Sequence, residues 1–463
     1  MLLVSHSIFA IESVVQESSA KNPRVENTPE ALSGSLKLLT TQYPTALPGN
    51  SQLSTDSNLV GNFKLQKSTG LKAMVDVTAA SSLSQNHSHF GVSELYAGQA
   101  WQEAKTQVFV GRKLEYWSLV DSDWQLGQWQ PTFSQIDALK PLDQGLTGLF
   151  FQQVSGPHDI LAFVTPVYIP SMGPDVQEKN GNLVSDSRWY RQPSSTFAYQ
   201  GVVTRVVYSL DIPDLAKLAS NPGGGVRYSV GANSPGFWLS TNLGYKPINS
   251  LLLSYRTILK TPEIDPRGEV TVVPVVGYHT IGGADFGYRF QRGVVALSYL
   301  ADNPQNKFPE DNWFQQQPRR FQAQAFHSQA DFDLLGFLEP VGFSLNYLRI
   351  NGGSIQDVDS SKTTQGALFD NRFIYTNAAT FKVDMRTYAF RKRMVSSFKY
   401  MREFDQKGTL VGAEVSVFPA QSWALSAGAD ILGPDQDRGN LDASFLNQFR
   451  ANDRYYGGMS YVF

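Results

Sequence analysis

The chain has 463 residues, of which 17% are charged and 12% aromatic, and its formal net charge at pH 7 is -2. The mean hydropathy is -0.25, and no uncharged apolar run approaches the roughly 20 residues of a spanning helix, so a helical membrane protein is excluded. Cysteine is absent, which excludes disulfides, thiol catalysis and cysteine-based metal sites. The near-neutral charge gives no reason to expect nucleic acid as a partner.

Residues 1–33 are expected to precede the folded part of the chain. The segment 1–13 is apolar enough for the core of a signal peptide, and Ala10 or Ala20 fits the small residue before a cleavage site. No Lys or Arg precedes this apolar run, so we expect a signal peptide whose basic start is missing, followed by a polar linker. A disordered mature N-terminus is the alternative.

From residue 34 onward, apolar and polar residues alternate in segments of about ten, which is the period of a strand with one apolar face. Connections alternate between short and long. The pattern predicts strands at 34–46, 58–67, 71–80, 91–100, 105–113, 145–154, 158–166, 200–210, 224–233, 236–244, 250–258, 283–291, 293–301, 319–329, 341–350, 378–388, 392–403, 408–418, 422–431 and 454–463. Merging one doubtful hairpin gives 18 strands, so we expect 18–20.

Three further segments do not fit as spanning strands. Alternation of short and long connections places 269–279 and 368–376 inside long loops, as strand extensions beyond the membrane. Residues 211–223 predict one short helix, on the side of the short turns.

The last strand carries the most specific signal. Tyr455, Gly457, Met459, Tyr461 and Phe463 alternate with a mostly polar or small set. This ending resembles the closing strand of bacterial outer-membrane β-barrels, whose assembly machinery recognises such a terminus. The resemblance implies an all-β fold over 34–463, a single transmembrane antiparallel up-and-down barrel with short periplasmic turns and long extracellular loops. It also implies a bacterial outer-membrane location, with outer-membrane lipid and, through Phe463, the barrel-assembly machinery as partners.

The alternation also separates lipid-facing from lumen-facing side chains. An Arg or Lys that faces hydrocarbon at mid-membrane costs about 2–4 kcal/mol, so charges on one face of a strand require water there. Basic residues outnumber acidic ones on this face, so we expect a mild preference for anions or neutral polar solutes. The residues expected to line the pore are Lys72, Asp76, Arg205, Arg227, Arg256, Asp285, Arg289, Lys382, Asp384 and Arg386.

Loop 114–144 is unusually rich in aromatic and acidic residues. In porins, which this chain resembles, one long early loop often folds into the barrel and sets the constriction. Aromatic faces beside carboxylates suit sugars, whereas the same aromatics also suit a structural brace against the wall. Both interpretations stay open. The residues expected in the constriction are Trp117, Asp121, Asp123, Trp124 and Trp129.

The sequence contains no motif that is typical of an enzyme. Neither a nucleotide-binding glycine loop in its strand–helix context nor a GxSxG elbow occurs, and His87 and His89 lack a third metal ligand. We therefore expect no catalysis, no cofactor and no metal. The expected function is an outer-membrane porin for passive or facilitated diffusion of small hydrophilic solutes. Channel-forming barrels of this size often trimerise, so a homotrimer is the assembly to test for.

Two other functions stay open. The stretch 109–117 (FVGRKLEYW) resembles a strand end of carbohydrate-type porins and alginate-export barrels. That resemblance suggests polysaccharide export. A structural or adhesive barrel, which would act through its long loops, is the third possibility.

Overall fold

The structure of the protein is a computed structural model. It describes residues 31–46, 53–67, 71–84, 88–101, 105–232, 234–260, 266–307, 309, 312–334, 337, 339–359, 364–365, 372–389, 391–435 and 444–463. The expected leader therefore lies almost wholly outside the described residues, as does His87. The first strand begins at Ala31, three residues before the start predicted from the alternation.

Eighteen strands form one antiparallel sheet that closes on itself where β1 (Ala31–Gln42) pairs with β29 (Arg454–Val462). This confirms the all-β barrel and the lower of the two predicted strand numbers. The other strands are β2 (Thr55–Lys67), β3 (Leu71–Ser82), β4 (Ser88–Trp101), β5 (Thr106–Lys113), β8 (Leu146–Ser155), β9 (His158–Thr165), β14 (Gly223–Val230), β15 (Gly236–Pro247), β18 (Tyr278–Phe290), β19 (Gly293–Gln305), β21 (Phe321–Phe332), β22 (Val341–Gly352), β25 (Asn377–Ala389), β26 (Lys392–Glu403), β27 (Gly408–Ala420) and β28 (Trp423–Pro434).

The barrel exterior is apolar, as the alternation predicted. On β18, Phe286, Tyr288 and Phe290 are 49%, 44% and 39% exposed, whereas Asp285, directly before Phe286, is 0% exposed. Aromatic side chains mark both ends of the exterior: Tyr245, Tyr400 and Tyr455 lie toward the loops, and Trp101, Phe237, Phe332 and Trp423 toward the turns. A closed barrel with an apolar exterior and aromatic belts satisfies every backbone group inside hydrocarbon, so it spans a membrane.

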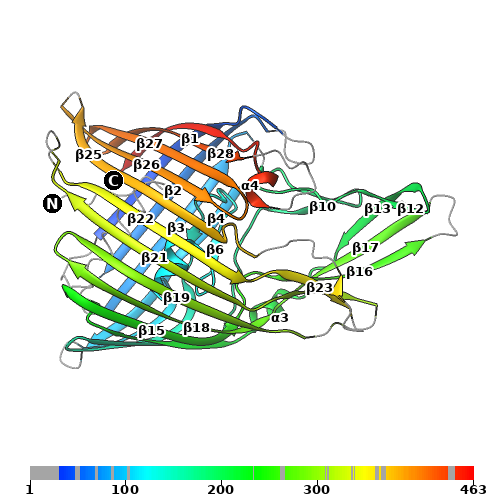
Figure 1. Cartoon of the computed structure of the whole chain (residues 1–463), viewed down its shortest axis with the longest axis horizontal. Coiled ribbons are helices and arrows are strands. Elements are labelled where there is room, and N and C mark those ends of the chain that lie inside the picture. Colours follow the sequence, from blue (N-terminus) through cyan, green and yellow to red (C-terminus); the bar gives the residue numbers. More distant parts are fainter. Residues whose placement is uncertain are drawn as a thin grey trace.

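Turns and loops separate to opposite ends of the barrel, which confirms their predicted alternation. The turns 156–157, 291–292 and 421–422 lie at the end where β1 begins and β29 ends, and the long loops lie at the other (Figure 1). We call these the turn end and the loop end.

A second sheet projects beyond the loop end (Figure 1). Four long loops supply its seven strands, and β13 and β17 within it run parallel. In spatial order the strands are β12 (Thr196–Tyr199), β13 (Val202–Leu210), β17 (Arg267–Val275), β16 (Leu252–Lys260), β20 (Phe314–Pro318), β23 (Ile355–Asp359) and β24 (Thr364–Gln365).

This outer sheet corrects two predicted spanning strands. Segments 200–210 and 250–258 correspond to β13 and β16, and removing them turns the twenty predicted strands into the eighteen observed. Any half-buried sheet has side chains with a period of two, so alternation alone does not separate an outer strand from a spanning one. Segment 269–279 is an extension, as predicted. Of segment 368–376, the part up to residue 371 lies outside the described residues, and 372–376 form no strand.

The remaining elements are short. The helices are α2 (Leu119–Asp123), α3 (Leu215–Ala219) and α4 (Phe445–Gln448); the small strands are β6 (Thr132–Phe133), β7 (Leu142–Asp143), β10 (Gln177–Lys179) and β11 (Asn182–Val184). The predicted helix within 211–223 exists as α3, but it lies at the loop end, because the strand before it belongs to the outer sheet. None of the described helices is long and apolar enough to cross a membrane.

A hydrophobic core fills the loop half of the barrel interior. Inward-facing side chains of the wall (Leu161, Ile281, Leu300, Leu348 and Met401) form one buried cluster with side chains from the loops (Trp117, Trp129, Trp189 and Leu446). The loops bring their own apolar side chains inside, and these are buried against the wall.

Candidate pore and constriction

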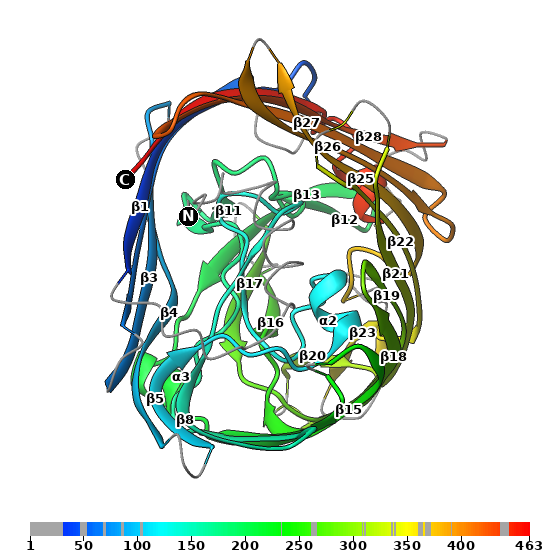
Figure 2. The ribbon, with the colours of Figure 1, turned by 90° about the vertical axis from the view of Figure 1, so that its left-hand side faces the viewer.

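The turn half of the barrel encloses a cavity of about 2170 Å³. Its walls are strands of the barrel and its boundary toward the loop end is loop 114–144. Figure 2 looks into the barrel from the turn end and shows α2 inside the ring of strands. None of the described residues of the outer sheet lines this cavity.

Seven of the ten residues expected to line a pore lie on the wall of this inner cavity: Lys72, Asp76, Arg227, Arg289, Lys382, Asp384 and Arg386. The other three do not. Arg205 and Arg256 lie on β13 and β16 of the outer sheet, and Asp285 is covered by loop 114–144. The part that any of the seven plays in solute passage stays a prediction.

Most charges on the cavity wall are paired with a neighbouring opposite charge. The Lys382 amine lies 2.9 Å from the Asp384 carboxylate, and the Arg227 guanidinium lies 3.2 Å from the Asp159 carboxylate. The whole lining, with loop 114–144 included, contains as many acidic side chains as basic ones, and the acidic residues of the loop balance the basic excess of the strands. The basic members are Lys67, Lys72, Lys105, Lys113, Lys140, Arg227, Arg289, Arg292, Lys382, Arg386 and Lys399; the acidic members are Asp76, Glu115, Asp121, Asp123, Asp143, Asp159, Asp331, Glu339, Asp384, Glu414 and Asp430.

Asp285 of the wall holds the beginning of α2. The helix has Ser118 as its N-cap, but that side chain makes no capping hydrogen bond. Instead, the Leu119 N–H donates to Asp285 Oδ2 at 3.1 Å, and the Val120 N–H donates to the Ser298 hydroxyl at 3.1 Å. A carboxylate at the amino end of a helix accepts hydrogen bonds from the free N–H groups and interacts favourably with the positive end of the helix dipole. Asp285 is therefore an anchor for the loop.

The far part of the same loop is attached to another region of the wall. Arg454 Nη2 lies 2.7 Å from Asp137 Oδ2 and 2.7 Å from Asp430 Oδ2. The Lys140 amine donates to the Tyr456 hydroxyl at 3.0 Å and lies 3.5 Å from Asp430. Since α2 is held by β18 and β19 and these contacts lie on β28 and β29, loop 114–144 crosses the barrel interior.

The loop tryptophans are largely buried inside the barrel. Trp117 and Trp129 stack with ring centroids 4.7 Å apart and are 2% and 0% exposed. Asp121 closes the loop around them by accepting hydrogen bonds from the N–H groups of Gln128 and Trp129, both at 2.9 Å. Trp124 packs edge-on against Tyr375. Burial of these rings supports the structural interpretation and leaves little ring surface for a sugar.

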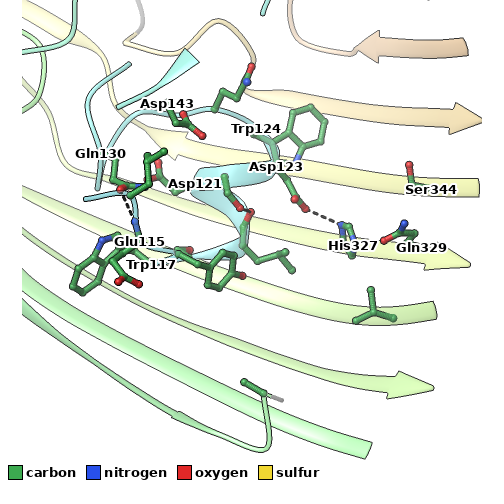
Figure 3. Close-up of a pocket in the computed structure, with 18 of the residues that line it drawn as sticks. Glu115, Trp117, Asp121, Asp123, Trp124, Gln130, Asp143, His327, Gln329 and Ser344 are labelled. Carbon is green, nitrogen blue, oxygen red and sulfur yellow. Dashed lines mark hydrogen bonds and ion pairs between the residues drawn. The ribbon is translucent and has the colours of Figure 1, made fainter. Parts of the chain in front are cut away.

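Carboxylates gather on the side of the loop that faces the cavity (Figure 3). Asp123 Oδ2 lies 2.8 Å from His327 Nδ1 on β21. Burial raises the pKa of Asp121, and burial together with the neighbouring Asp121 carboxylate raises the pKa of Asp143 to about 7. The charge of this surface therefore changes near neutral pH.

The sequence carries no motif that marks His327 of the wall or Lys140 of the loop as residues that hold the loop in place. No local signal identifies Asp137 as the partner of Arg454, because 317 residues separate them. His89 contacts Gln135 at 3.1 Å. The described residues contain no group of three or more side chains suited to hold a metal ion.

Comparison with known proteins gives likeness in fold only. No family model matches the chain, and no curated protein matches its sequence. Among solved structures, Acinetobacter baumannii OccAB4 is 10% identical, with 96% of this chain and 100% of that chain covered and a TM-score of 0.46. Salmonella typhi OmpF, solved with daunomycin, is 11% identical, with 94% and 97% covered and a TM-score of 0.40. A mutant of the Rh. blastica porin is 10% identical, with 94% and 100% covered and a TM-score of 0.39.

Proposed function

We propose that this protein is a bacterial outer-membrane porin that lets small hydrophilic solutes diffuse across the membrane without chemical change. The observation that carries the proposal is a closed membrane-spanning barrel whose turn half encloses a large cavity lined by charged side chains. Charged side chains on an inner wall need water around them, and a hydrated space inside a membrane-spanning barrel is the basis of a diffusion channel.

The preferred solutes are small and carry no net charge. Because the acidic and basic side chains of the cavity lining are equally numerous and mostly paired, their fields largely cancel at distances longer than the spacing within a pair. We therefore propose neutral polar solutes, and no longer anions, as the preferred class.

Planar-bilayer recording with the folded protein tests the proposal. We expect discrete single-channel steps and, across a KCl gradient, a reversal potential close to zero because ion selectivity is weak. A strong anion or cation preference would contradict the solute class. Absence of any current from protein whose folding is verified by its strand content would contradict the channel itself.

The outer sheet favours one second candidate, a structural or adhesive barrel. Seven strands project beyond the barrel, and Val202 and Val203 near the tip of the β12–β13 hairpin are 62% and 75% exposed. Binding to surfaces that is lost on deletion of residues 196–207, in a protein without channel activity, would favour this candidate. The expected homotrimer, and the recognition of Phe463 by the assembly machinery, stay proposals beside either function.

A further inference from the structure

A second, smaller pocket lies at the loop end of the barrel. Its volume is about 150 Å³, and its lining includes Tyr43 beyond β1, Ile136 of loop 114–144, and Ser185 and Trp189 of the loop that follows β9. We call it the outer pocket. Ile136 belongs to its lining, whereas Leu139 and Lys140, only a few residues later, line the inner cavity. The two spaces are therefore neighbours, and residue Asp137 lies between them along the chain.

Arg454 occupies the boundary between these two spaces. The centre of its guanidinium lies 5.8 Å from the ring of Trp189, which lines the outer pocket, and 5.8 Å from the ring of Tyr456, which lines the inner cavity. Arg454 and Asp137 belong to neither lining. The guanidinium is held in place by Asp137 of the loop and Asp430 of the wall, both at 2.7 Å.

We propose that solutes pass between the outer pocket and the inner cavity along β28 and β29, and that the Arg454–Asp137 ion pair is the gate on this route. The inference rests on the proposed channel function. It places the route beside β28 and β29, because the linings of the two spaces approach each other there, on either side of Arg454.

The chemistry of the proposed gate predicts that it opens rarely but reversibly. Asp137 and Arg454 are 6% exposed each, so their charges are largely withdrawn from water. Separating them leaves the Asp137 carboxylate buried without its counter-charge, whereas Arg454 keeps Asp430. This is unfavourable unless water or a polar solute replaces the lost partner of Asp137. A hydrated solute supplies that replacement as it passes, whereas an apolar solute does not.

The first test compares two matched substitutions in single-channel recordings. Asp137→Asn removes the charge that holds Arg454 but keeps the side-chain oxygen that accepts the Leu139 N–H at 2.9 Å. Asp159→Asn is the control, because Asp159 forms a similarly buried pair with Arg227 on the inner cavity wall, away from the outer pocket. We expect Asp137→Asn to raise the ratio of open to closed time by about tenfold, the order expected for loss of one charge-assisted hydrogen bond.

The second test locates the route by chemical modification. Since the chain has no cysteine, Ser185→Cys introduces a single thiol in the outer pocket, and Ser209→Cys places one on β13 of the outer sheet as a control. A bulky, membrane-impermeant methanethiosulfonate added at the loop side is expected to block most of the current through the first variant and none through the second.

The outcomes separate the gate from the channel. If the unsubstituted protein conducts but Asp137→Asn matches Asp159→Asn, or modified Ser185→Cys conducts normally, the proposed route and gate are wrong and the channel function stands. If no folded variant, including Asp137→Asn, conducts at all, both proposals fail together. A tenfold change confined to Asp137→Asn, with block confined to Ser185→Cys, supports the gate.

Discussion

Removing the Asp285 carboxylate tests directly how loop 114–144 is held inside the barrel. In Asp285→Ala the Leu119 N–H loses its acceptor at 3.1 Å, and the Tyr116 hydroxyl loses a weaker one at 3.4 Å. Ser118 offers no side-chain replacement at this helix end. A hydrogen bond to a charged group contributes about 1.5–3 kcal/mol. Counting one full and one weak bond, we expect docking of the loop to weaken by about 2–4 kcal/mol.

Hydrogen–deuterium exchange measures this loss locally. If the amides of Leu119 and Val120 exchange when the loop undocks, their protection should fall by roughly 30- to 700-fold, the factor that corresponds to the weakened docking. Exchange in the barrel strands should stay unchanged. Asp331→Ala is the control, since Asp331 lines the same cavity from β21 without a described hydrogen bond to the loop. Unchanged protection at Leu119 in Asp285→Ala would refute the anchoring role.

Three further substitutions have defined outcomes. The pKa of Asp143 is about 7 in the folded protein and about 3.9 in an unfolded chain, so the folded state binds the extra proton between these values. The free energy of unfolding then falls as pH rises from about 4 to 7, and the cavity gains a negative charge as Asp143 loses its proton. In the unsubstituted protein, the reversal potential should therefore shift toward cation preference near neutral pH. In Asp143→Asn it should not shift. Gly111→Ala should impair folding, because φ at Gly111 is 126° and an added Cβ meets the Leu95 carbonyl. The expected sign is loss of heat-modifiable migration in gels, and normal migration would contradict this expectation. Trp129→Ala should lower the free energy of packing in the buried core by about 3–5 kcal/mol. The loop should then be cleaved faster by a protease within residues 114–144, and an unchanged cleavage rate would count against a bracing role.

The inner cavity and the loop that bounds it were only partly predictable. Alternation placed Arg227, Lys382 and Asp384 on the inner face correctly, since the direction of a side chain follows from its position along a strand. The same rule put Asp285 on the inner face but said nothing of the helix that covers it. The tryptophans of loop 114–144 allow two interpretations, and their burial favours the brace over a sugar-binding surface.

What the sequence determined by itself is the barrel: its all-β class, its apolar exterior and its last strand, because each follows from a local repeat of two residues. Tertiary structure alone decided that β13 and β16 leave the wall, because a half-buried outer strand repeats in the same way as a spanning one. It also decided which charges meet. Arg454 and Asp137 pair across 317 residues, and such a pairing depends on how the closed barrel and its folded-in loop bring distant segments together, which no local pattern records.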